Sequence, residues 1–458
     1  MKARLSDIIR VSGGRTSGLL DPRAEVTGLT VDSRRAGPGV MFAALKGKVS
    51  DGHDFIGEAI RKGAPAALCS AGDDESPDGR IVVDDVEAAL ARIASYNRDV
   101  VDPIVVGITG SIGKTSTKDY TSSVAERKFR TVATERSYNN EVGVPLTLLS
   151  ADPGTEVLVV ELAARGKGQI AELCEYVRPQ VGVVTNVGIT HIEVFGSQDS
   201  IARTKGELIS SLPEGGVAVL NADDELAMAM KERSAAEILT FGFGHESQVR
   251  GQDVSLDSDA RPSFEISHAG GRQGVQLQSP GRQQVPNALA AAAVGIALGL
   301  SLEDCAAGLE SAKGSPFRME VTTQGGITFL NDAWNAGPDS VAAAIETCSA
   351  MRRPGGRLIA VLGFMAELGH LSVQEHLKAG RIAAAAADKL IVVGPRSLGI
   401  AKGAMDAGMA DVVSVEDATA AVLELTDLKP GDLVLVKASR SERLEGLVDR
   451  IKTEVVGA

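Results

Sequence analysis

The sequence predicts an α/β protein of three domains. Its 458 residues exceed one ordinary domain, because domains usually contain about 100–200 residues. Short runs of β-branched and other apolar residues alternate with stretches of helical spacing, which is typical of a parallel sheet covered by helices on both faces. Changes in this pattern place the domains at residues 1–102, 103–313 and 314–458.

Composition and charge narrow the class of protein. Hydrophobic residues make up 44% and charged residues 23%, as in globular rather than disordered chains. The net charge of −13 argues against a general nucleic-acid or anionic-membrane binder, which needs a basic face. The N-terminus lacks the apolar segment of a signal peptide, and the longest uncharged apolar stretch, 288–302, is short for a bilayer span. We therefore expect a cytoplasmic protein without stable membrane insertion, and four reduced, mostly buried cysteines.

Two series of strands and helices follow the first unit. The run Ile104–Thr109, bounded by glycine and rich in β-branched residues, predicts a buried parallel strand. Further strands are predicted in the central domain at 157–162, 181–186 and 217–221, with helices at 118–127, 198–210 and 287–300. A weak alternation at 263–268 and 274–278 indicates an antiparallel insertion or edge. In the last domain we expect strands at 327–331, 358–362, 390–393 and 433–437, and helices at 339–351, 373–387, 417–425 and 441–453.

The most specific motif is the glycine-rich segment Gly107-Ile-Thr-Gly-Ser-Ile-Gly-Lys-Thr-Ser116, between a predicted strand and a predicted helix. Glycines let backbone N–H groups turn inward on phosphates, and the following helix adds its positive N-terminal end. Lys114 would then reach the β- and γ-phosphates, and the Thr115 hydroxyl would bind Mg²⁺. The loop is a variant, because Ile108 stands where the strict pattern has glycine.

The loop indicates ATP rather than GTP, because the sequence contains no Asn-Lys-x-Asp guanine motif. The alternative is a glycine-rich turn with an accidental Lys-Thr pair, which requires strand, loop and helix to coincide by chance. We expect the ATP phosphates to contact Thr109, Gly110, Ser111, Ile112, Gly113, Lys114, Thr115 and Ser116.

Motifs along essentially the whole chain resemble the Mur ligases of peptidoglycan synthesis. They include Val-Asp-Ser-Arg at 31–34, Tyr-Asn-Asn-Glu-Val-Gly-Val-Pro-Leu-Thr at 138–147, Thr-Asn-Val-Gly-Ile-Thr-His at 185–191, Phe-Arg-Met-Glu at 317–320 and Asn-Asp-Ala-Trp-Asn-Ala-Gly-Pro-Asp-Ser at 331–340. The resemblance implies a small N-terminal α/β substrate domain, a central P-loop ATPase domain with a parallel sheet, and a C-terminal Rossmann-like ligase domain.

The resemblance also implies an activity. Mur ligases use ATP and Mg²⁺ to activate a carboxylate as an acyl phosphate, which an amine then attacks. The segments at 138–147 and 331–340 are most similar to the member that joins D-alanyl-D-alanine to a UDP-muramoyl-tripeptide. These two compounds are the expected partners, and we expect a monomer that does not bind nucleic acid.

The same resemblance implies catalytic and metal-binding roles for Glu161, His191 and Lys205, beside Lys114 and Thr115. Glu161 ends a predicted strand, where ligands of open α/β sheets bind. A lysine matching Lys205 is often carbamylated in the family, which converts a cation into an anion that can hold Mg²⁺. From the residues alone, each of the three could equally be a surface group or a structural one.

Further roles come from resemblance only. Asn287 should contact adenine, Arg318 should lie near the γ-phosphate, and Asp332 should bind the ribose hydroxyls. The residues implied in binding the other substrates, from the uridine diphosphate to the reaction centre, are Asp32, Ser33, Arg34, Lys46, His53, Asn139, Asn140, Asn335, Lys437, Ser439 and Arg440. Departures from the family pattern are Ile112, Gln283, Trp334 and Phe364.

Three alternatives stay open. The ligase that adds the third peptide residue usually carries Asp-Asn-Pro-Arg in its last domain, and this string is absent. Folylpolyglutamate synthase has its ATP loop near the N-terminus, whereas about a hundred residues precede the loop here. A nucleotide-binding protein that has lost ligase activity is a rival of another class, which substrate-dependent phosphate release would distinguish.

Overall fold

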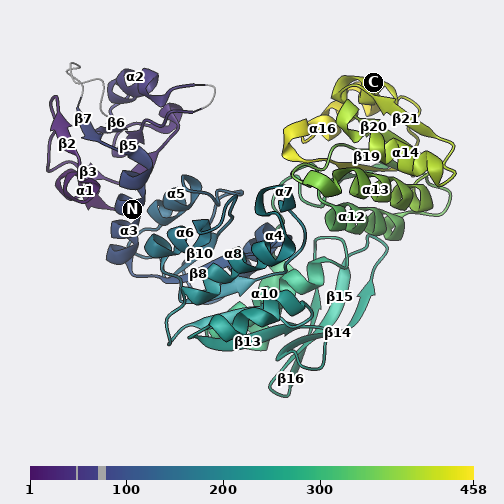
Figure 1. The fold of residues 1–458 in the computed structure, drawn as a ribbon, viewed down its shortest axis with the longest axis horizontal. Helices are drawn as coiled ribbons and strands as arrows, with labels where there is room; N and C mark the ends of the chain where they lie inside the picture. The colour runs from purple at the N-terminus through teal and green to yellow at the C-terminus, as the bar shows by residue number, and fades with distance from the viewer. Residues whose placement is uncertain (48–49, 71–78, 458) are drawn as a thin grey trace.

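The computed structural model describes residues 1–47, 50–70 and 79–457 and folds into three successive lobes (Figure 1). The N-terminal lobe has a five-stranded sheet of order β2-β7-β6-β5-β4 and a small pair, β1-β3. Its strands are β1 (Ala3–Arg4), β2 (Arg15–Ser17), β3 (Glu25–Val26), β4 (Gly28–Thr30), β5 (Val40–Ala43), β6 (Ala67–Ser70) and β7 (Arg80–Val83). Its helices are α1 (Leu5–Ser12), α2 (Ile56–Arg61) and α3 (Val86–Val101).

The central lobe is built on a nine-stranded sheet of order β16-β15-β14-β13-β12-β11-β8-β10-β9. Strands β8 to β14 run parallel, and β14, β15 and β16 form the predicted antiparallel edge. The strands are β8 (Ile104–Thr109), β9 (Thr131–Ala133), β10 (Val157–Glu161), β11 (Val181–Val184), β12 (Val217–Asn221), β13 (Glu237–Gly242), β14 (Val249–Leu256), β15 (Pro262–His268) and β16 (Gly271–Gln276). The helices are α4 (Lys114–Ala125), α5 (Gly143–Ser150), α6 (Gln169–Val177), α7 (Ile192–Phe195), α8 (Gln198–Ser210), α9 (Glu225–Met228), α10 (Gln284–Ala297) and α11 (Leu302–Ser311).

Alternate residues of the central strands pack into two different cores. Leu158 and Val160 of β10 face the core that contains α5, α6 and α8, whereas Val157 and Val159 face the core that contains α4, α10 and α11. A strand that is buried on both faces reads as a continuous apolar run, which is why the sequence pattern identified it. Helices on both faces leave the ends of the strands as the accessible place for ligands.

The C-terminal lobe repeats this architecture with a six-stranded sheet of order β17-β18-β22-β19-β20-β21. Only β17 is antiparallel to its neighbour within this sheet. The strands are β17 (Glu320–Gln324), β18 (Ile327–Asn331), β19 (Leu358–Leu362), β20 (Lys389–Val393), β21 (Val412–Val415) and β22 (Leu433–Lys437). The helices are α12 (Pro338–Met351), α13 (Ser372–Ala386), α14 (Leu398–Asp406), α15 (Ala418–Leu423) and α16 (Leu447–Ile451).

Several predicted helices differ from the observed ones at their ends, and the helix expected at 118–127 already begins at Lys114. The helix expected at 441–453 is wrong over its first half: α16 begins only at Leu447, because the chain first makes a short 3-10 turn that ends at Arg443 in the left-handed region (φ 54°). The helix expected from Asn287 starts at Gln284, so Asn287 lies in its first turn. The α/β class and the three-lobed architecture are confirmed. We propose 1–102, 103–313 and 314–458 as domain limits, because the first two end just after α3 and α11.

Candidate active site

The glycine-rich loop connects β8 to α4, as predicted, and its glycines are required by close contacts. Gly113 has φ 84°, and a Cβ on it would lie 2.1 Å from Asn287 Oδ1. A Cβ on Gly110 would lie 1.8 Å from Thr185 Oγ1. A side chain at either position would collide with Asn287 or Thr185 unless these moved, and the positive φ of Gly113 also favours glycine, so close packing requires glycine in this loop. The contact with Gly113 also brings Asn287 to the loop from 174 residues later in the sequence.

The segment after β11 holds this loop in place. Asn186 accepts from Ile112 N through Oδ1 (3.0 Å) and donates to Ile112 O through Nδ2 (3.0 Å). Thr185 Oγ1 donates to Ile112 O (2.6 Å), and Ser111 Oγ accepts from Gly188 N (2.9 Å). Sequence reasoning noted the motif at 185–191 but assigned a role only to its histidine. The structure adds Thr185, Asn186 and Gly188 as residues that position the loop.

Lys114 folds back over the loop that it follows. Its Nζ donates to Gly110 O (2.7 Å) and to Ser111 O (3.2 Å). Burial lowers the pKa of Lys114, the nearby Glu161 opposes that change, and Arg318 adds to it. An anion placed on the loop would restore the charged form, because an opposite charge stabilises it. The remaining loop residues are also buried or half-buried, and the Oγ1 of Thr109 has no hydrogen-bond partner among the described residues.

Oxygen ligands gather at the start of α4. Thr115 Oγ1 donates to Glu161 Oε2 (2.8 Å), and Asn139 Nδ2 donates to Glu161 Oε1 (2.6 Å). Glu161 is the last residue of β10 and is 1% exposed, so these contacts orient a buried carboxylate beside the phosphate loop. Asn139 therefore lies at this carboxylate. Its neighbour Asn140 instead accepts from Gly143 N (3.0 Å) and stabilises the start of α5.

Two further cations face this region. The pKa of Lys205, on α8, is well below its ordinary value because of burial first and repulsion from Lys114 second. Lys205 forms no ion pair with any residue in the described ranges. Arg318 reaches from the segment between α11 and β17 and donates to Ser137 Oγ (3.1 Å). Lys114 and Arg318 thus lie near the single carboxylate of Glu161, an arrangement that favours an anionic ligand.

His191 is engaged by the C-terminal lobe. Its Nδ1 pairs with the carboxylate of Glu367, and Glu193 N donates to Glu367 O (3.3 Å). Both His191 (φ 65°) and Glu367 (φ 63°) adopt the left-handed conformation, so each turn presents its side chain to the other lobe. The sequence did not indicate Glu367, whose only signal is its place in the loop after β19.

The residues expected to bind the nucleotide and the acceptor lie at the end of β22 and on the loops after β18 and β22. Several of their side chains form bonds with other residues of the protein. The Asp332 carboxylate accepts from Met319 N (3.1 Å) and pairs with Lys437, which is 2% exposed and also donates to Asn335 O (2.9 Å). Ser439 is buried, and its Oγ accepts from Ala366 N (2.9 Å). Lys437 and Ser439 therefore hold these loops together in this arrangement.

Trp334 lies between two arginines near the same lobe interface. The guanidinium of Arg440 lies 4.2 Å from the ring centroid of Trp334, and that of Arg318 lies 5.7 Å from it. Trp334 N donates to Phe317 O (3.2 Å), which ties the tryptophan loop to the segment between the lobes. That this loop faces the active site stays a prediction. The contacts of Trp334 with Arg318 and Phe317 are compatible with it, because Arg318 also contacts the central lobe.

The N-terminal residues form two small networks. Asp32 accepts from Arg34 through both oxygens (2.8 and 2.7 Å), and this arginine lowers the pKa of Asp32 to about 2. The Ser33 carbonyl accepts from Lys62 Nζ (3.2 Å). His53 Nδ1 pairs with Asp51 Oδ1 (2.6 Å), and Asp51 lies opposite Lys46 in an isolated bridge. Arg35 lies 4.0 Å from Glu135 of the central lobe. This part of the N-terminal lobe is therefore close to the segment that carries Asn139.

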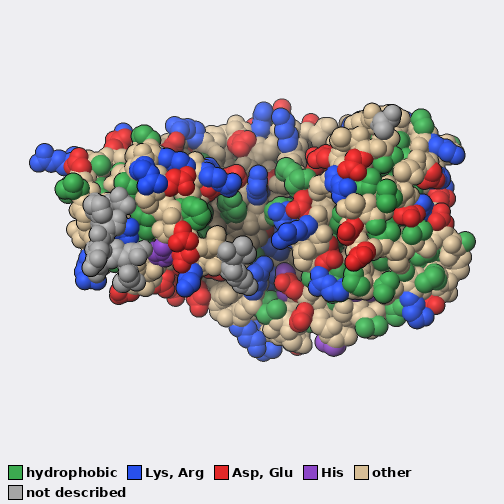
Figure 2. All heavy atoms as spheres, turned by 90° about the horizontal axis from the view of Figure 1, so that it is seen from above, with side chains coloured by type: hydrophobic (Ala, Val, Ile, Leu, Met, Phe, Trp, Pro, Cys, Tyr) green, Lys and Arg blue, Asp and Glu red, His purple; other side chains and the backbone are tan. Residues whose placement is uncertain are grey.

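The surface between the outer lobes is hollowed, and Lys and Arg side chains surround the hollow (Figure 2). No group of three or more His, Cys, Asp and Glu side chains suited to a metal ion occurs in residues 1–47, 50–70 and 79–457. None of the helices in these ranges is long and apolar enough to cross a membrane. All four cysteines are buried, as predicted.

Comparisons with known proteins identify the class to which this fold and site belong. Family models match residues 108–295 (Mur ligase middle domain), 317–440 (Mur ligase, glutamate ligase domain) and 25–98 (Mur ligase family, catalytic domain). The chain belongs to the Mur ligase family, as the sequence motifs predicted.

Relatives and solved structures point to one member of the family. UDP-N-acetylmuramoyl-tripeptide–D-alanyl-D-alanine ligases of Mycobacterium leprae and Escherichia coli are 39% and 33% identical and cover 98% and 97% of this chain and 97% of their own lengths. The crystal structure of MurF from Acinetobacter baumannii superimposes with a TM-score of 0.88 at 29% identity, covering 99% of both chains. MurF from Thermotoga maritima in complex with ADP has a TM-score of 0.80 at 30% identity, covering 93% of this chain and 97% of its own.

Proposed function

We propose that this protein is the ATP-dependent ligase that joins D-alanyl-D-alanine to UDP-N-acetylmuramoyl-tripeptide in peptidoglycan precursor synthesis. The observation that carries the proposal is the glycine loop, shaped by contacts with Asn287 and Thr185, beside Lys114, Thr115 and Glu161. Full-length relatives and the ADP-bound MurF structure support ATP as the nucleotide.

The reaction has two steps that these residues can serve. A carboxylate oxygen of the tripeptide attacks the γ-phosphorus of ATP, ADP leaves, and an acyl phosphate forms. The amine of D-alanyl-D-alanine then attacks the carbonyl carbon, phosphate leaves, and the amide remains. Both partners of the first step are anions, so Lys114 and Arg318 would neutralise them and align them, which is the main contribution of proteins to phosphoryl transfer.

The side chains at the start of α4 fit Mg²⁺. Thr115 supplies a hydroxyl and Glu161 a carboxylate, which are hard oxygen ligands, and Asn139 orients the carboxylate. Bound there, Mg²⁺ would neutralise charge on the phosphates of ATP. Few protein ligands suffice, because Mg²⁺ usually keeps several waters and phosphate oxygens.

Lys205 is proposed to act as a carbamate. Burial and the neighbouring Lys114 lower the pKa of Lys205, which favours the neutral amine, and a neutral amine is the form that attacks CO₂ and then loses a proton. The product carries a negative charge beside Lys114, which removes the repulsion between two amines and supplies another oxygen ligand. Lys205→Ala should lose Mg²⁺-dependent turnover, and a small added carboxylic acid should restore part of it. Native mass spectrometry checks the modification directly.

For His191 we propose a role at the metal or in orienting its ligands. Because its Nδ1 pairs with Glu367, the pair fixes the ring and leaves Nε2 as the nitrogen that could bind a ligand. Asn287, Arg318 and Asp332 are proposed at the adenine, the γ-phosphate and the ribose. For Asp332, ribose binding would require its pair with Lys437 to loosen.

Acceptor specificity tests the proposal against its rivals. ADP and phosphate release should be strong with UDP-muramoyl-tripeptide plus D-alanyl-D-alanine, and weak with lysine or diaminopimelate as acceptor on the dipeptide precursor. The opposite preference would assign the chain to the ligase that adds the third residue. Absence of substrate-dependent phosphate release, with ATP still bound, would identify a nucleotide-binding protein without ligase activity.

A further inference from the structure

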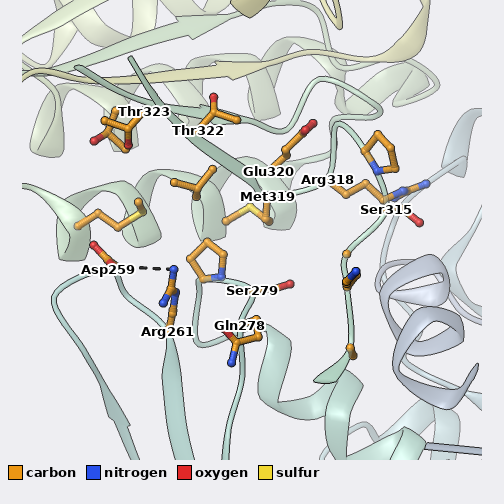
Figure 3. A pocket seen from close by; sticks show the side chains of 18 of the residues that line it. Asp259, Arg261, Gln278, Ser279, Ser315, Arg318, Met319, Glu320, Thr322 and Thr323 are labelled. Carbon is orange, nitrogen blue, oxygen red and sulfur yellow. Dashed lines mark ion pairs between the residues drawn. The ribbon is translucent and has the colours of Figure 1, made fainter. Parts of the chain in front are cut away.

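A cavity of about 640 Å³ lies behind the segment 311–320 that links the central and C-terminal lobes (Figure 3). Its walls come from four places: the β14–β15 turn, the chain that follows β16, strand β17, and the C-terminal end of α12. None of the residues 109–116 lines it, so it is separate from the phosphate loop. A volume in this range is typical of small-molecule sites.

The charge inside the cavity favours an anion. Arg261, Lys313 and Arg353 line it, and Asp259 is held only loosely, 4.0 Å from Arg261 and 3.8 Å from Arg353. Lys313 has no ion-pair partner in the part of the chain that the structure describes. The acidic Glu320 already accepts from Phe317 N (2.9 Å). A local excess of positive charge in a chain of net charge −13 indicates a site that attracts anions.

The other lining groups favour hydroxyls on the ligand. Gln278, Thr323 and Thr328 line the cavity, and their side chains form no hydrogen bond with any described residue. The buried side chains of Met319, labelled in Figure 3, and Pro280 also line the cavity and supply apolar surface. Cations, free amide and hydroxyl groups, and an apolar floor together suit a phosphate ester of a polyhydroxy compound, of sugar-phosphate to mononucleotide size.

The wall of this cavity is also the back of the nucleotide site. Ser315 donates to Asp119 Oδ2 of α4 through N (3.1 Å) and Oγ (2.7 Å). Arg318 leaves the cavity toward Ser137 Oγ, and Phe317 O accepts from Trp334 N. The segment 311–320 thus lines the cavity on one side, and on its other side it contacts α4 and the loop that carries Trp334.

We propose that this cavity is an effector site for a phosphate ester of a polyhydroxy compound, and that its occupation tightens ATP binding by holding the segment 311–320 in the arrangement seen here. Coupling between two sites is reciprocal, so ATP should tighten binding of the effector by the same factor. A coupling of about fivefold is the lower end of the usual range.

Calorimetric titration of the full-length protein with ribose 5-phosphate tests the proposal. Ribose 5-phosphate is the smallest probe of the proposed class, and inorganic phosphate and ribose are titrated as its parts. We expect one saturable site for ribose 5-phosphate, tighter than for either part. A non-hydrolysable ATP analogue at saturation should raise the affinity for ribose 5-phosphate about fivefold. If ribose 5-phosphate instead occupied the ATP site, the analogue would abolish its binding.

Matched variants locate the site. The double variant Arg261→Ala/Arg353→Ala should bind ribose 5-phosphate at least tenfold more weakly. If this variant unfolds too easily to be measured, Lys313→Ala replaces it and should also weaken binding. Arg272→Ala is the control, because it is exposed on β16 and pairs with Glu265 outside the cavity. Equal binding by all variants, affinity no greater than for inorganic phosphate alone, or loss of binding with the ATP analogue would overturn the proposal. None of these readouts depends on the ligase reaction.

Discussion

The two junctions between lobes are built differently. At the first, residues of the N-terminal lobe and of the central lobe share one hydrophobic core, in which Leu90 and Ile93 of α3 join Leu148 of α5. Asn97 donates to Leu148 O (2.9 Å) and Ala151 O (3.1 Å), and the N-terminal amine donates to Leu149 O (3.0 Å). Burial of this kind gives a junction that resists opening.

The second junction is mostly polar. It includes the His191–Glu367 pair, the bonds of Ser315 and Arg318 to the central lobe, and a hydrogen bond from Gln283 Nε2 to Thr347 Oγ1 (3.3 Å), and Ala260 adds an apolar contact with the C-terminal core. A large cavity lies beside it. Polar contacts of modest net energy can exchange partners, so this junction is the one that ligands can rearrange. The comparison teaches that a shared hydrophobic core joins the N-terminal lobe to the central lobe, whereas mainly polar contacts, which can exchange partners, join the C-terminal lobe to it.

The largest effect is expected at Lys114 of the phosphate loop, near Arg318 of the second junction. Lys114→Ala should reduce turnover about 10²–10³-fold, because it removes a cation from a water-poor site. Stability should not fall, since burial already disfavours the charged lysine. Phosphate-release kinetics and thermal melting measure the two. Lys378→Ala, an exposed lysine of α13, is the control, and near-normal turnover in folded Lys114→Ala would refute the assignment of the loop.

The first junction should respond in stability. Leu148→Ala removes a fully buried side chain and should cost about 2–5 kcal/mol of unfolding free energy. Denaturant unfolding measures the change, and Leu423→Ala, at a leucine that is 68% exposed, should cost far less. Equal costs at both positions would mean that the first junction is not a shared core.

The polar junction should respond in activity instead. Glu367→Gln keeps the shape but removes the charge of the pair with His191, so kcat/KM should fall roughly tenfold while stability changes by less than about 1 kcal/mol. Steady-state kinetics and denaturant unfolding give both values. Glu193→Gln, next to the pair but exposed, should behave as wild type. A Glu367→Gln protein that unfolds easily would show that this junction, too, is a stabilising core.

The smallest expected effect is a pH dependence of the C-terminal lobe. Burial lowers the pKa of His376, whose Nδ1 donates to Ser372 O (2.6 Å) and whose Nε2 accepts from Met365 N (3.0 Å). The unfolded chain therefore takes up a proton at a higher pH than the native state. The stability contribution is complete above the unfolded-state pKa, about 6.5, and is lost as pH falls below it. Melting curves between pH 5 and 8 should show this slope, and His376→Gln should flatten it.

Periodicity and one short motif were enough to predict the central strands of the two larger sheets and the phosphate loop. Other elements carried no such signal. Helix α14 contains Gly399 and Gly403, which weaken a helical pattern. They are there because α14 packs tightly on α13: a Cβ on Gly403 would lie 2.1 Å from Leu377 O. Strand β21 is half-buried and short, so its alternation was lost among neighbouring polar residues.

The sequence by itself determined the α/β class, the nucleotide loop, the family and the central strands of the two larger sheets, because these depend on local spacing of apolar residues, glycines and a few polar groups. Tertiary structure alone decided which charges meet. It joined His191 to Glu367 across 176 residues, Lys437 to Asp332 across 105, and left Lys205 without a partner among the described residues. It also left a cavity behind the segment 311–320. Such pairings depend on how lobes pack, and no local pattern encodes a distance between residues far apart in the chain.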